Sequence, residues 1–240
     1  MPSVLAYHRP ESLDEASTLL ARPDRRAVGG GTVIVPQARQ IADIGVELVD
    51  LQSLGLDTIE TDDNRLRLGA MVRLSDLVSH PATPTLLADL ARRELPSAQR
   101  NQATVGGTAA LGWPDSVLVA GLLAHNAIVE IHGAEPTALA GVLGAVTGRI
   151  ITGVTIETDG AGGYAATGRT PGDEPIVAAV ARATAGSPYL ALTGVATTPV
   201  LVDPADPTAR LSPAGDFRGS PEYRLHLAGV LAQRALGEIA

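Results

Sequence analysis

Two glycine-rich turns are the parts of this sequence best suited to chemistry. The first is Val28-Gly29-Gly30-Gly31-Thr32, and the second is Thr104-Val105-Gly106-Gly107-Thr108. Glycine lets backbone amides come close to a phosphate, and consecutive amides can form a concave anion site. Each turn precedes a predicted helix or turn, whose first amides also favour an anion. The two turns together therefore suit a diphosphate held from two sides, although tight turns at strand ends would use the same glycines.

Other kinds of active site find no suitable residues. The chain has no cysteine, which excludes disulfides, thiolate nucleophiles and cysteine-ligated metal clusters within it. All 18 basic residues are arginine, so both a Walker-type phosphate loop and a pyridoxal phosphate site lack their lysine. No Gly-x-Ser-x-Gly nucleophile elbow occurs, and no two of the five histidines share a metal-ligand spacing. We therefore expect no metal site.

Composition indicates a globular protein of one large domain or two small ones. Of the 240 residues, 45% are hydrophobic and 18% are charged, with a net charge of −8. An acidic chain is poorly suited to general nucleic-acid binding. Neither a secretory signal nor an uninterrupted apolar stretch of membrane-spanning length is evident. The sequence therefore predicts a cytoplasmic protein without nucleic-acid or membrane partners.

The hydrophobic pattern predicts strands and helices that alternate along the chain. A capping box from Ser12 to Glu15 predicts a helix over about 12–21. The flexible segment Asp159–Gly163 is the best candidate for a domain boundary. Beyond it we expect strands near 163–168, 188–196 and 199–202, and helices near 174–185 and 220–236. The whole chain is therefore expected to be α+β.

Seven segments, read in order, resemble a known family. They are AVGGGTVIVPQAR, RLGAMVRLSDL, QRNQATVGGTAAL, RIITGVTIET, YAATGRTPGDEPIVAAVA, LALTGVATTPV and SPEYRLHLAGVLAQRAL. Together they resemble the FAD-binding (medium) subunit of the molybdenum hydroxylases, the group of carbon monoxide dehydrogenase and xanthine dehydrogenase. The third and the last segments are the most specific, and the resemblance covers nearly the entire chain.

The resemblance implies the fold and its division into domains. An FAD-binding domain of the vanillyl-alcohol-oxidase (PCMH) type would span residues 1–158, with subdomains at about 1–55 and 56–158. A C-terminal domain of the CO-dehydrogenase-flavoprotein type would span 161–240. This second domain would hold a three-stranded antiparallel sheet with helices.

The resemblance also implies FAD as the cofactor and a set of residues that contact it. The first turn would hold the diphosphate on one side, and the second would hold it on the other and reach the ribityl chain. Ile150 or Ile151 and Tyr164 would lie near the isoalloxazine ring, and the flavin itself would carry the redox chemistry. The implied cofactor-binding residues are Gly29, Gly30, Gly31, Thr32, Val33, Thr104, Val105, Gly106, Gly107, Thr108, Asp115, Ile150, Ile151 and Tyr164.

Four positions depart from the family pattern. They are Val33, Thr108, Val117 and Ala166, where the family usually has Asp, Asn, Asp and Lys. In the family, an aspartate that contacts the flavin stands at the position of Val117. Asp115 lies two residues before this position.

The resemblance implies an electron-transfer subunit. Such a chain passes electrons between iron–sulfur and molybdopterin partner subunits and an external acceptor. Without cysteine, this chain would need a partner for the iron–sulfur relay. Two alternatives fit the same sequence. One is a stand-alone FAD-dependent enzyme of a biosynthetic pathway, and the other is a non-catalytic binding protein derived from a flavin domain.

Overall fold

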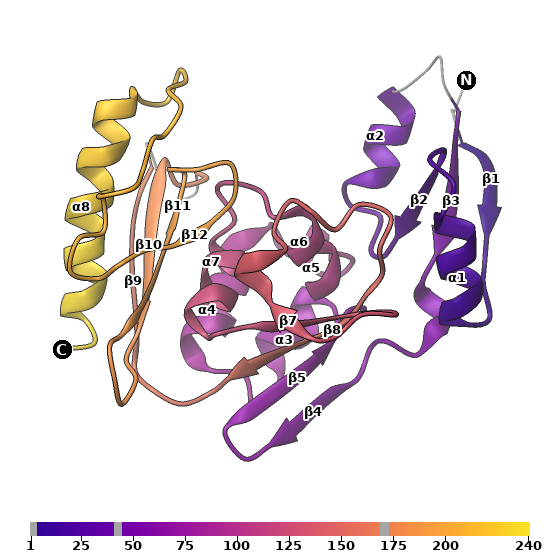
Figure 1. Ribbon diagram of the computed structural model, residues 1–240, viewed down its shortest axis with the longest axis horizontal. Helices are drawn as coiled ribbons and strands as arrows, with labels where there is room; N and C mark the ends of the chain where they lie inside the picture. Colours follow the sequence, from indigo (N-terminus) through magenta and orange to yellow (C-terminus); the bar gives the residue numbers. More distant parts are fainter. Residues whose placement is uncertain (1–3, 41–44, 169–172) are drawn as a thin grey trace.

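Three β-sheets follow one another along the chain (Figure 1). The computed structural model describes residues 4–40, 45–168 and 173–240. Two segments on which predictions rest lie outside these ranges. They are Met1–Ser3, part of the stretch considered for a secretory signal, and residues 169–172 of the fifth resembling segment. In Figure 1 the N-terminal sheet lies on the right, the second sheet in the middle and the C-terminal sheet on the left. The predicted α+β class is confirmed.

The N-terminal sheet is parallel, and its carboxyl edge leads into the first glycine turn. Its strands, in the order β1-β3-β2, are β1 (Val4–His8), β3 (Val46–Asp50) and β2 (Arg25–Val28), and its helices are α1 (Leu13–Leu20) and α2 (Ile34–Gln40). Helix α1 begins where predicted, because the Ser12 hydroxyl accepts a hydrogen bond from the Glu15 amide. Strand β2 ends at Val28, so Gly29 leaves the edge at which parallel sheets commonly bind ligands.

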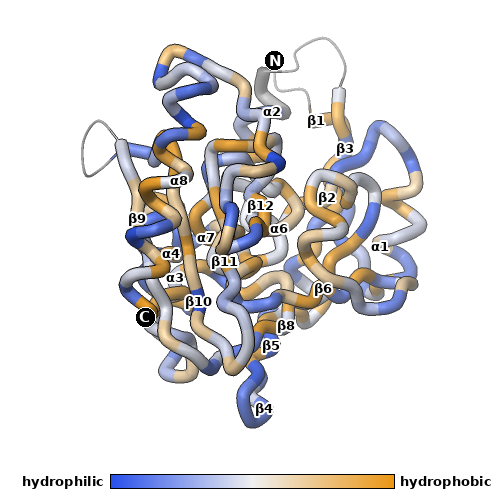
Figure 2. The backbone as a smooth tube through the Cα atoms, turned by 60° about the vertical axis from the view of Figure 1, so that its left-hand side comes forward, coloured by the Kyte–Doolittle hydropathy of each residue, from blue (hydrophilic) through white to orange (hydrophobic). Residues whose placement is uncertain are grey.

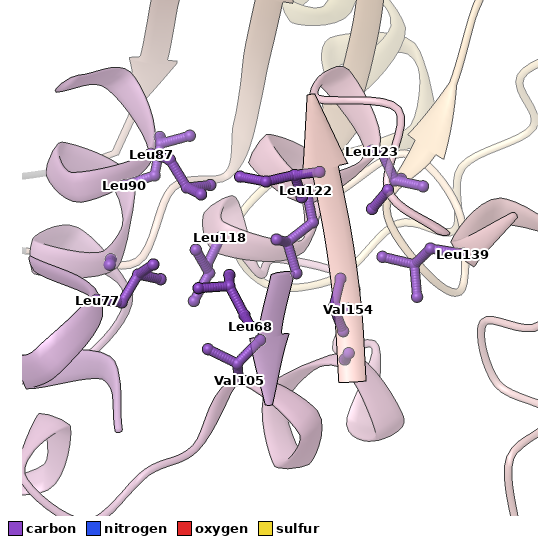
Figure 3. Close-up of a cluster of buried hydrophobic side chains, with 14 of the residues drawn as sticks. Leu68, Leu77, Leu87, Leu90, Val105, Leu118, Leu122, Leu123, Leu139 and Val154 are labelled. Carbon is purple, nitrogen blue, oxygen red and sulfur yellow. The ribbon is translucent and has the colours of Figure 1, made fainter. Parts of the chain in front are cut away.

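The second sheet is antiparallel and carries the main core. Its order is β4-β5-β8-β6-β7, with β4 (Ile59–Asp62), β5 (Arg65–Gly69), β8 (Ile151–Glu157), β6 (Ile128–Ile131) and β7 (Thr137–Ala138). Its helices are α3 (Leu74–Ser79), α4 (Thr85–Glu94), α5 (Ser97–Arg100), α6 (Val105–Leu111) and α7 (Val117–Ala124). Figure 3 shows Leu68 and Val154 of the sheet packed with leucines of α4 and α7. The β4 end is hydrophilic and projects from the molecule (Figure 2).

The C-terminal sheet is antiparallel, as expected, and lies between two helices. Its order is β12-β11-β10-β9, with β9 (Gly162–Thr167), β10 (Val177–Arg182), β11 (Tyr189–Thr193) and β12 (Val200–Leu201). The strands predicted near 163–168, 188–196 and 199–202 correspond to β9, β11 and β12, and β10 is a fourth strand that was not expected. Helix α8 (Pro221–Gly237) covers one face, and α7 packs on the other. No helix in the described part of the chain is long and apolar enough to cross a membrane.

The helix predicted over 174–185 is wrong, because this segment contains strand β10. Every residue of β10 is buried. Ala178 and Val180 point into the core shared with α7, whereas Val177, Ala179 and Ala181 point into the core under α8. A strand covered on both faces has no polar alternation, so its sequence resembles that of a buried helix.

A buried arginine joins the C-terminal sheet to the middle of the molecule. The Arg182 guanidinium donates hydrogen bonds to the carbonyl oxygen of Ala124 at 2.8 Å and to the carboxylate of Asp159 at 2.9 Å. It also pairs with the carboxylate of Glu157, the last residue of β8. A buried charge is tolerated where it is paired and hydrogen-bonded in this way. The contact fixes β10 against the end of α7.

The histidine at the end of α7 should make the stability depend on pH. His125 is 1% exposed, and its Nδ1 donates a hydrogen bond to the Glu157 carbonyl oxygen at 2.7 Å. Burial lowers the pKa of His125 from 6.5 to about 4. Between these pH values the unfolded chain binds more protons at this site than the folded protein does. The free energy of unfolding should therefore fall by up to about 3 kcal/mol as the pH falls from 6.5 to 4.

Urea unfolding across this pH range tests the effect. His125→Asn should flatten the part of the profile that His125 causes, because asparagine does not titrate in this pH range. A His125→Asn profile parallel to that of the wild type would contradict the assignment.

Candidate functional site

The two glycine turns, far apart in the sequence, meet in space. A Cβ atom added at Gly30 would lie 1.7 Å from the carbonyl oxygen of Gln102, and one at Gly29 would lie 2.9 Å from Thr104 Oγ1. The backbone of the first turn therefore lies directly against the segment that begins the second. Gly31 has a φ of 72°, which glycine adopts without strain. This close approach needs glycine.

The first turn presents unpaired backbone amides. In the part of the chain that the structure describes, no N–H from Gly29 to Val33 donates a hydrogen bond to the protein. The bonds that open α2 begin later, from the Val35 amide to the Gly31 carbonyl at 3.2 Å. A run of uncommitted amides beside a helix start is a general means of binding an anion. The turn can therefore hold a phosphate without losing internal hydrogen bonds.

The second turn is different, because its amides from Val105 to Thr108 donate hydrogen bonds inside the protein. The Val105 and Gly106 amides donate to the carbonyl oxygens of Val72 and Ala70, both at 2.9 Å. The Gly107 amide donates to the Thr104 hydroxyl, which caps helix α6, at 3.2 Å. The glycines of this turn therefore contribute mainly backbone surface to the site. Gly107 differs from Val105 and Gly106 in that its amide is bonded to a side chain and not to a backbone carbonyl.

A single cleft of about 1200 Å³ contains both turns. It is lined by residues of all three parts of the chain, and it exceeds the size common for small-ligand pockets. Of the residues predicted to contact the cofactor, only Val105 does not line it, because its side chain lies in the core. All four departures from the family pattern, Val33, Thr108, Val117 and Ala166, line it. The structure therefore brings the predicted residues together around a cavity large enough for a dinucleotide.

Arginines give the cleft a positive charge that the acidic composition conceals. Arg149 and Arg234 form no ion pair with any described residue, and the Arg26 guanidinium donates only to backbone carbonyl oxygens. Arginines have no spacing signature, and the pairs Arg25-Arg26 and Arg92-Arg93 were expected to be solvated ends of helices or strands, so the sequence assigned no arginine to the site. The arginines that line the cleft are Arg26, Arg92, Arg93, Arg100, Arg149 and Arg234.

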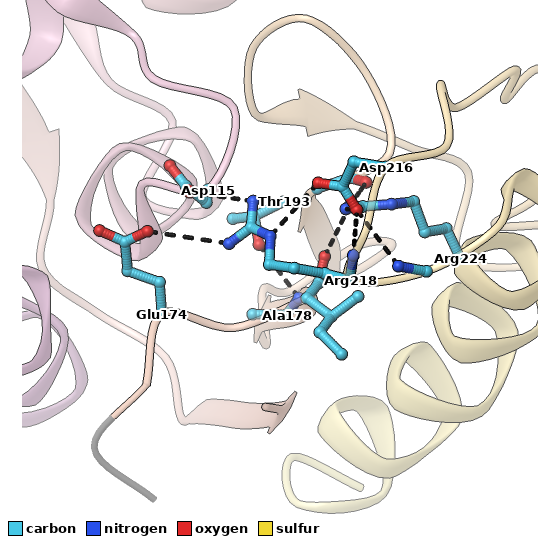
Figure 4. Close-up of polar contacts among 10 residues, drawn as sticks. Asp115, Glu174, Ala178, Thr193, Asp216, Arg218 and Arg224 are labelled. Atoms are coloured by element: carbon cyan, nitrogen blue, oxygen red, sulfur yellow. Dashed lines mark hydrogen bonds and ion pairs between the residues drawn. The ribbon is translucent and has the colours of Figure 1, made fainter. Parts of the chain in front are cut away.

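Asp115 lies in an ion network that connects the middle and C-terminal parts (Figure 4). Its carboxylate is 3.5 Å from an Arg218 nitrogen, and Glu174 is 3.7 Å from another. Asp216 pairs with Arg218 and also accepts from Arg224 at 2.8 Å. Arg218 therefore ties the loop before α7 to the loop before α8. This places Asp115 at the cleft but already paired.

Glu94, at the end of α4, is a cleft residue that the sequence analysis missed. Its carboxylate accepts hydrogen bonds from the Ser116 hydroxyl at 2.7 Å and the Leu118 amide at 2.9 Å, at the start of α7. Burial raises the pKa of the Glu94 carboxyl, against the lowering effect of these two bonds. No local pattern marks this residue, because its partners come from another helix.

Apolar and aromatic side chains form the rest of the predicted site. Ile150 and Ile151 are buried at the cleft, where Ile150 packs against the core under α1. The guanidinium carbon of Arg93 lies 5.1 Å from the centre of the Tyr164 ring. Burial raises the pKa of the Tyr164 phenol, partly opposed by Arg93. These side chains provide surfaces for a flat ring.

Comparison with known proteins identifies the class. Residues 3–139 match the family described as the FAD binding domain in molybdopterin dehydrogenase, and the chain belongs to this family. The resemblance read from the sequence is therefore confirmed, and so is FAD as the cofactor of this fold.

Relatives match along almost the whole chain. The carbon monoxide dehydrogenase medium chain of Afipia carboxidovorans is 28% identical, over 98% of this chain and 96% of its own length. The uncharacterised protein YgfM of Escherichia coli K12 is also 28% identical, over 94% and 92%. Carbon monoxide dehydrogenase from Hydrogenophaga pseudoflava has the same fold, with a TM-score of 0.88, 24% identity and coverage of 100% of this chain and 98% of that chain.

Replacing Gly107 tests whether the second turn faces the cofactor. A Cβ at Gly107 would meet only Thr104 Oγ1, at 2.9 Å, whereas a Cβ at Gly106 would meet Ala70 Cβ at 2.6 Å. Gly107→Val should fold and should weaken FAD binding tenfold or more, by about 1.4 kcal/mol or above. Gly106→Val should mainly lower the melting temperature.

Titration of the apo-protein with FAD, with thermal melting in parallel, distinguishes these effects. Gly141→Ala is the neutral control, because nothing lies within 4 Å of its added Cβ and it does not line the cleft. A folded Gly107→Val protein with wild-type FAD affinity would show that the turn is purely structural.

Proposed function

We propose that this chain is the FAD-carrying electron-transfer subunit of a heteromeric molybdenum-containing dehydrogenase. The observation that carries the proposal is the meeting of two glycine turns, one with free amides, in a cleft that arginines line. Family membership and the full-length similarity to a carbon monoxide dehydrogenase medium chain support it.

The residues at the cleft fit FAD in two respects. The amides from Gly29 to Val33 have no protein partner to lose, and the glycines let the two turns lie directly against each other at the cleft. When bound, FAD supplies reversible redox chemistry that no side chain here can supply. The chain's own contribution would be to hold the diphosphate at Gly29–Val33 and Gly106–Thr108.

The other cleft residues would orient the flavin and keep water from it. Ile150, Ile151 and Tyr164 offer apolar and aromatic surface to a flat ring. Asp115, paired with Arg218, would fix the wall formed by the start of α7. The side chains of Val33, Val117 and Ala166 are uncharged. They would make the cleft less polar than one that has the charged residues of the family pattern at these positions.

We also propose the domain division implied by the sequence. One sheet lies within about 1–55, one within 56–158 and one within 161–240. FAD would then lie where all three units meet, since each contributes residues to the cleft.

The partners would be an iron–sulfur subunit and a molybdopterin subunit. This chain has no cysteine to ligate a cluster, so the iron–sulfur relay to its flavin would belong to another protein. Substrate oxidation would then take place on the molybdenum subunit, and this chain would pass the electrons to an external acceptor.

A stand-alone flavoenzyme is the second candidate. The observation in its favour is that Val33, Val117 and Ala166 line the cleft where the family pattern has charged residues. Such an enzyme would turn over a substrate without any iron–sulfur or molybdenum partner.

Cofactor analysis of the protein tests the proposal. The chain expressed alone should bind FAD one to one, release FAD rather than FMN on heating, and contain no iron. Expressed in its native host, it should purify with iron and molybdenum in fixed ratio to flavin. Absence of FAD binding would contradict the proposal, and flavin-dependent activity of the chain alone would favour the second candidate.

A further inference from the structure

The only tryptophan of the chain lies in the cleft with its side chain partly open. Trp113 is 44% exposed and lines the cleft next to Leu111, which is 40% exposed. Other aromatic side chains are also exposed, among them Tyr7, Phe217 and Tyr223, but none of these three lines the cleft. Uncovered apolar surface inside a cleft commonly marks the place of a ligand.

The backbone on both sides of Trp113 is fixed. Gly112 ends helix α6 in the left-handed conformation, with a φ of 52°. Pro114 follows, and its carbonyl oxygen accepts a hydrogen bond from the Gly194 amide at 2.7 Å. The Trp113 carbonyl oxygen accepts from the Ser116 amide at 3.0 Å. The ring is thus attached to a rigid support, which lowers the entropy cost of stacking a ligand on it.

Helix α6 sets the distance between the second glycine turn and this ring. The helical part from Gly107 to Leu111 spans about 6 Å at the rise of an α-helix, and two further residues lead to Trp113. Both positions line the same cleft. A ribose or ribityl unit bridges a span of this order between a diphosphate at the turn and a flat ring at Trp113.

We propose that Trp113 is the platform on which one conjugated ring of FAD stacks. The inference rests on the proposed function, since it takes the diphosphate position from it. The adenine half and the isoalloxazine half of FAD have the same general structure. Each is a flat conjugated ring joined to a phosphate through a sugar or sugar alcohol. Tyr164, the other aromatic residue lining the cleft, has the Arg93 guanidinium over its ring, so Trp113 offers the more open aromatic surface.

Calorimetric titration of apo-protein variants with FAD tests the platform. Trp113→Leu keeps apolar bulk without a flat ring and should weaken FAD binding tenfold or more. Trp113→Phe should stay within about threefold of the wild type, because a ring remains. The matched control is Tyr223→Leu, which removes an aromatic side chain that is 45% exposed but outside the cleft, and it should bind FAD like the wild type.

Two smaller ligands show which half of FAD stacks. If the ring is adenine, Trp113→Leu should weaken ADP binding and leave FMN binding unchanged, and the reverse holds for isoalloxazine. Trp113→Leu that melts like the wild type and binds FAD equally well would overturn the platform and leave the proposed function intact. Failure of the wild type to bind FAD would contradict the proposed function itself.

Discussion

The contact between Gly30 and the Gln102 carbonyl oxygen is the constraint on which this site depends. A methyl group at Gly30 would lie 1.7 Å from that oxygen, so the two backbones touch without side chains between them. The contact brings the carboxyl edge of the parallel sheet against the start of α6. Because of this contact, both turns line the same cleft. The first turn contributes its free amides, and the second contributes backbone surface at its glycines.

The C-terminal part completes the cleft and is held rigidly to it. Helix α7 packs between the middle core and the C-terminal sheet, so neither can move without disturbing the other. Two arginines strengthen this junction: buried Arg182 binds the end of α7, and Arg218 pairs with Asp115 at its start. Electron transfer and ligand binding both benefit from a cofactor site whose walls keep a fixed separation.

The sequence predicted what depends on local chemistry and missed what depends on distant partners. The glycine turns and the family resemblance indicated the residues that line the cleft, and the Ser12 cap predicted the start of α1. Strand β10 was mistaken for a helix, because burial on both faces removes the alternation that distinguishes the two. The engaged amides of Val105 and Gly106 could not be foreseen, because their acceptors, Val72 and Ala70, belong to another segment.

Amide hydrogen exchange at the first glycine turn tests the central claim most directly. The claim is that the amides from Gly29 to Val33, which have no protein acceptor in the described structure, hold the diphosphate of FAD. Saturating FAD should slow their exchange strongly, whereas the bonded Val105 and Gly106 amides should already exchange slowly without it. Unchanged exchange from Gly29 to Val33 in protein that has bound FAD would contradict the account.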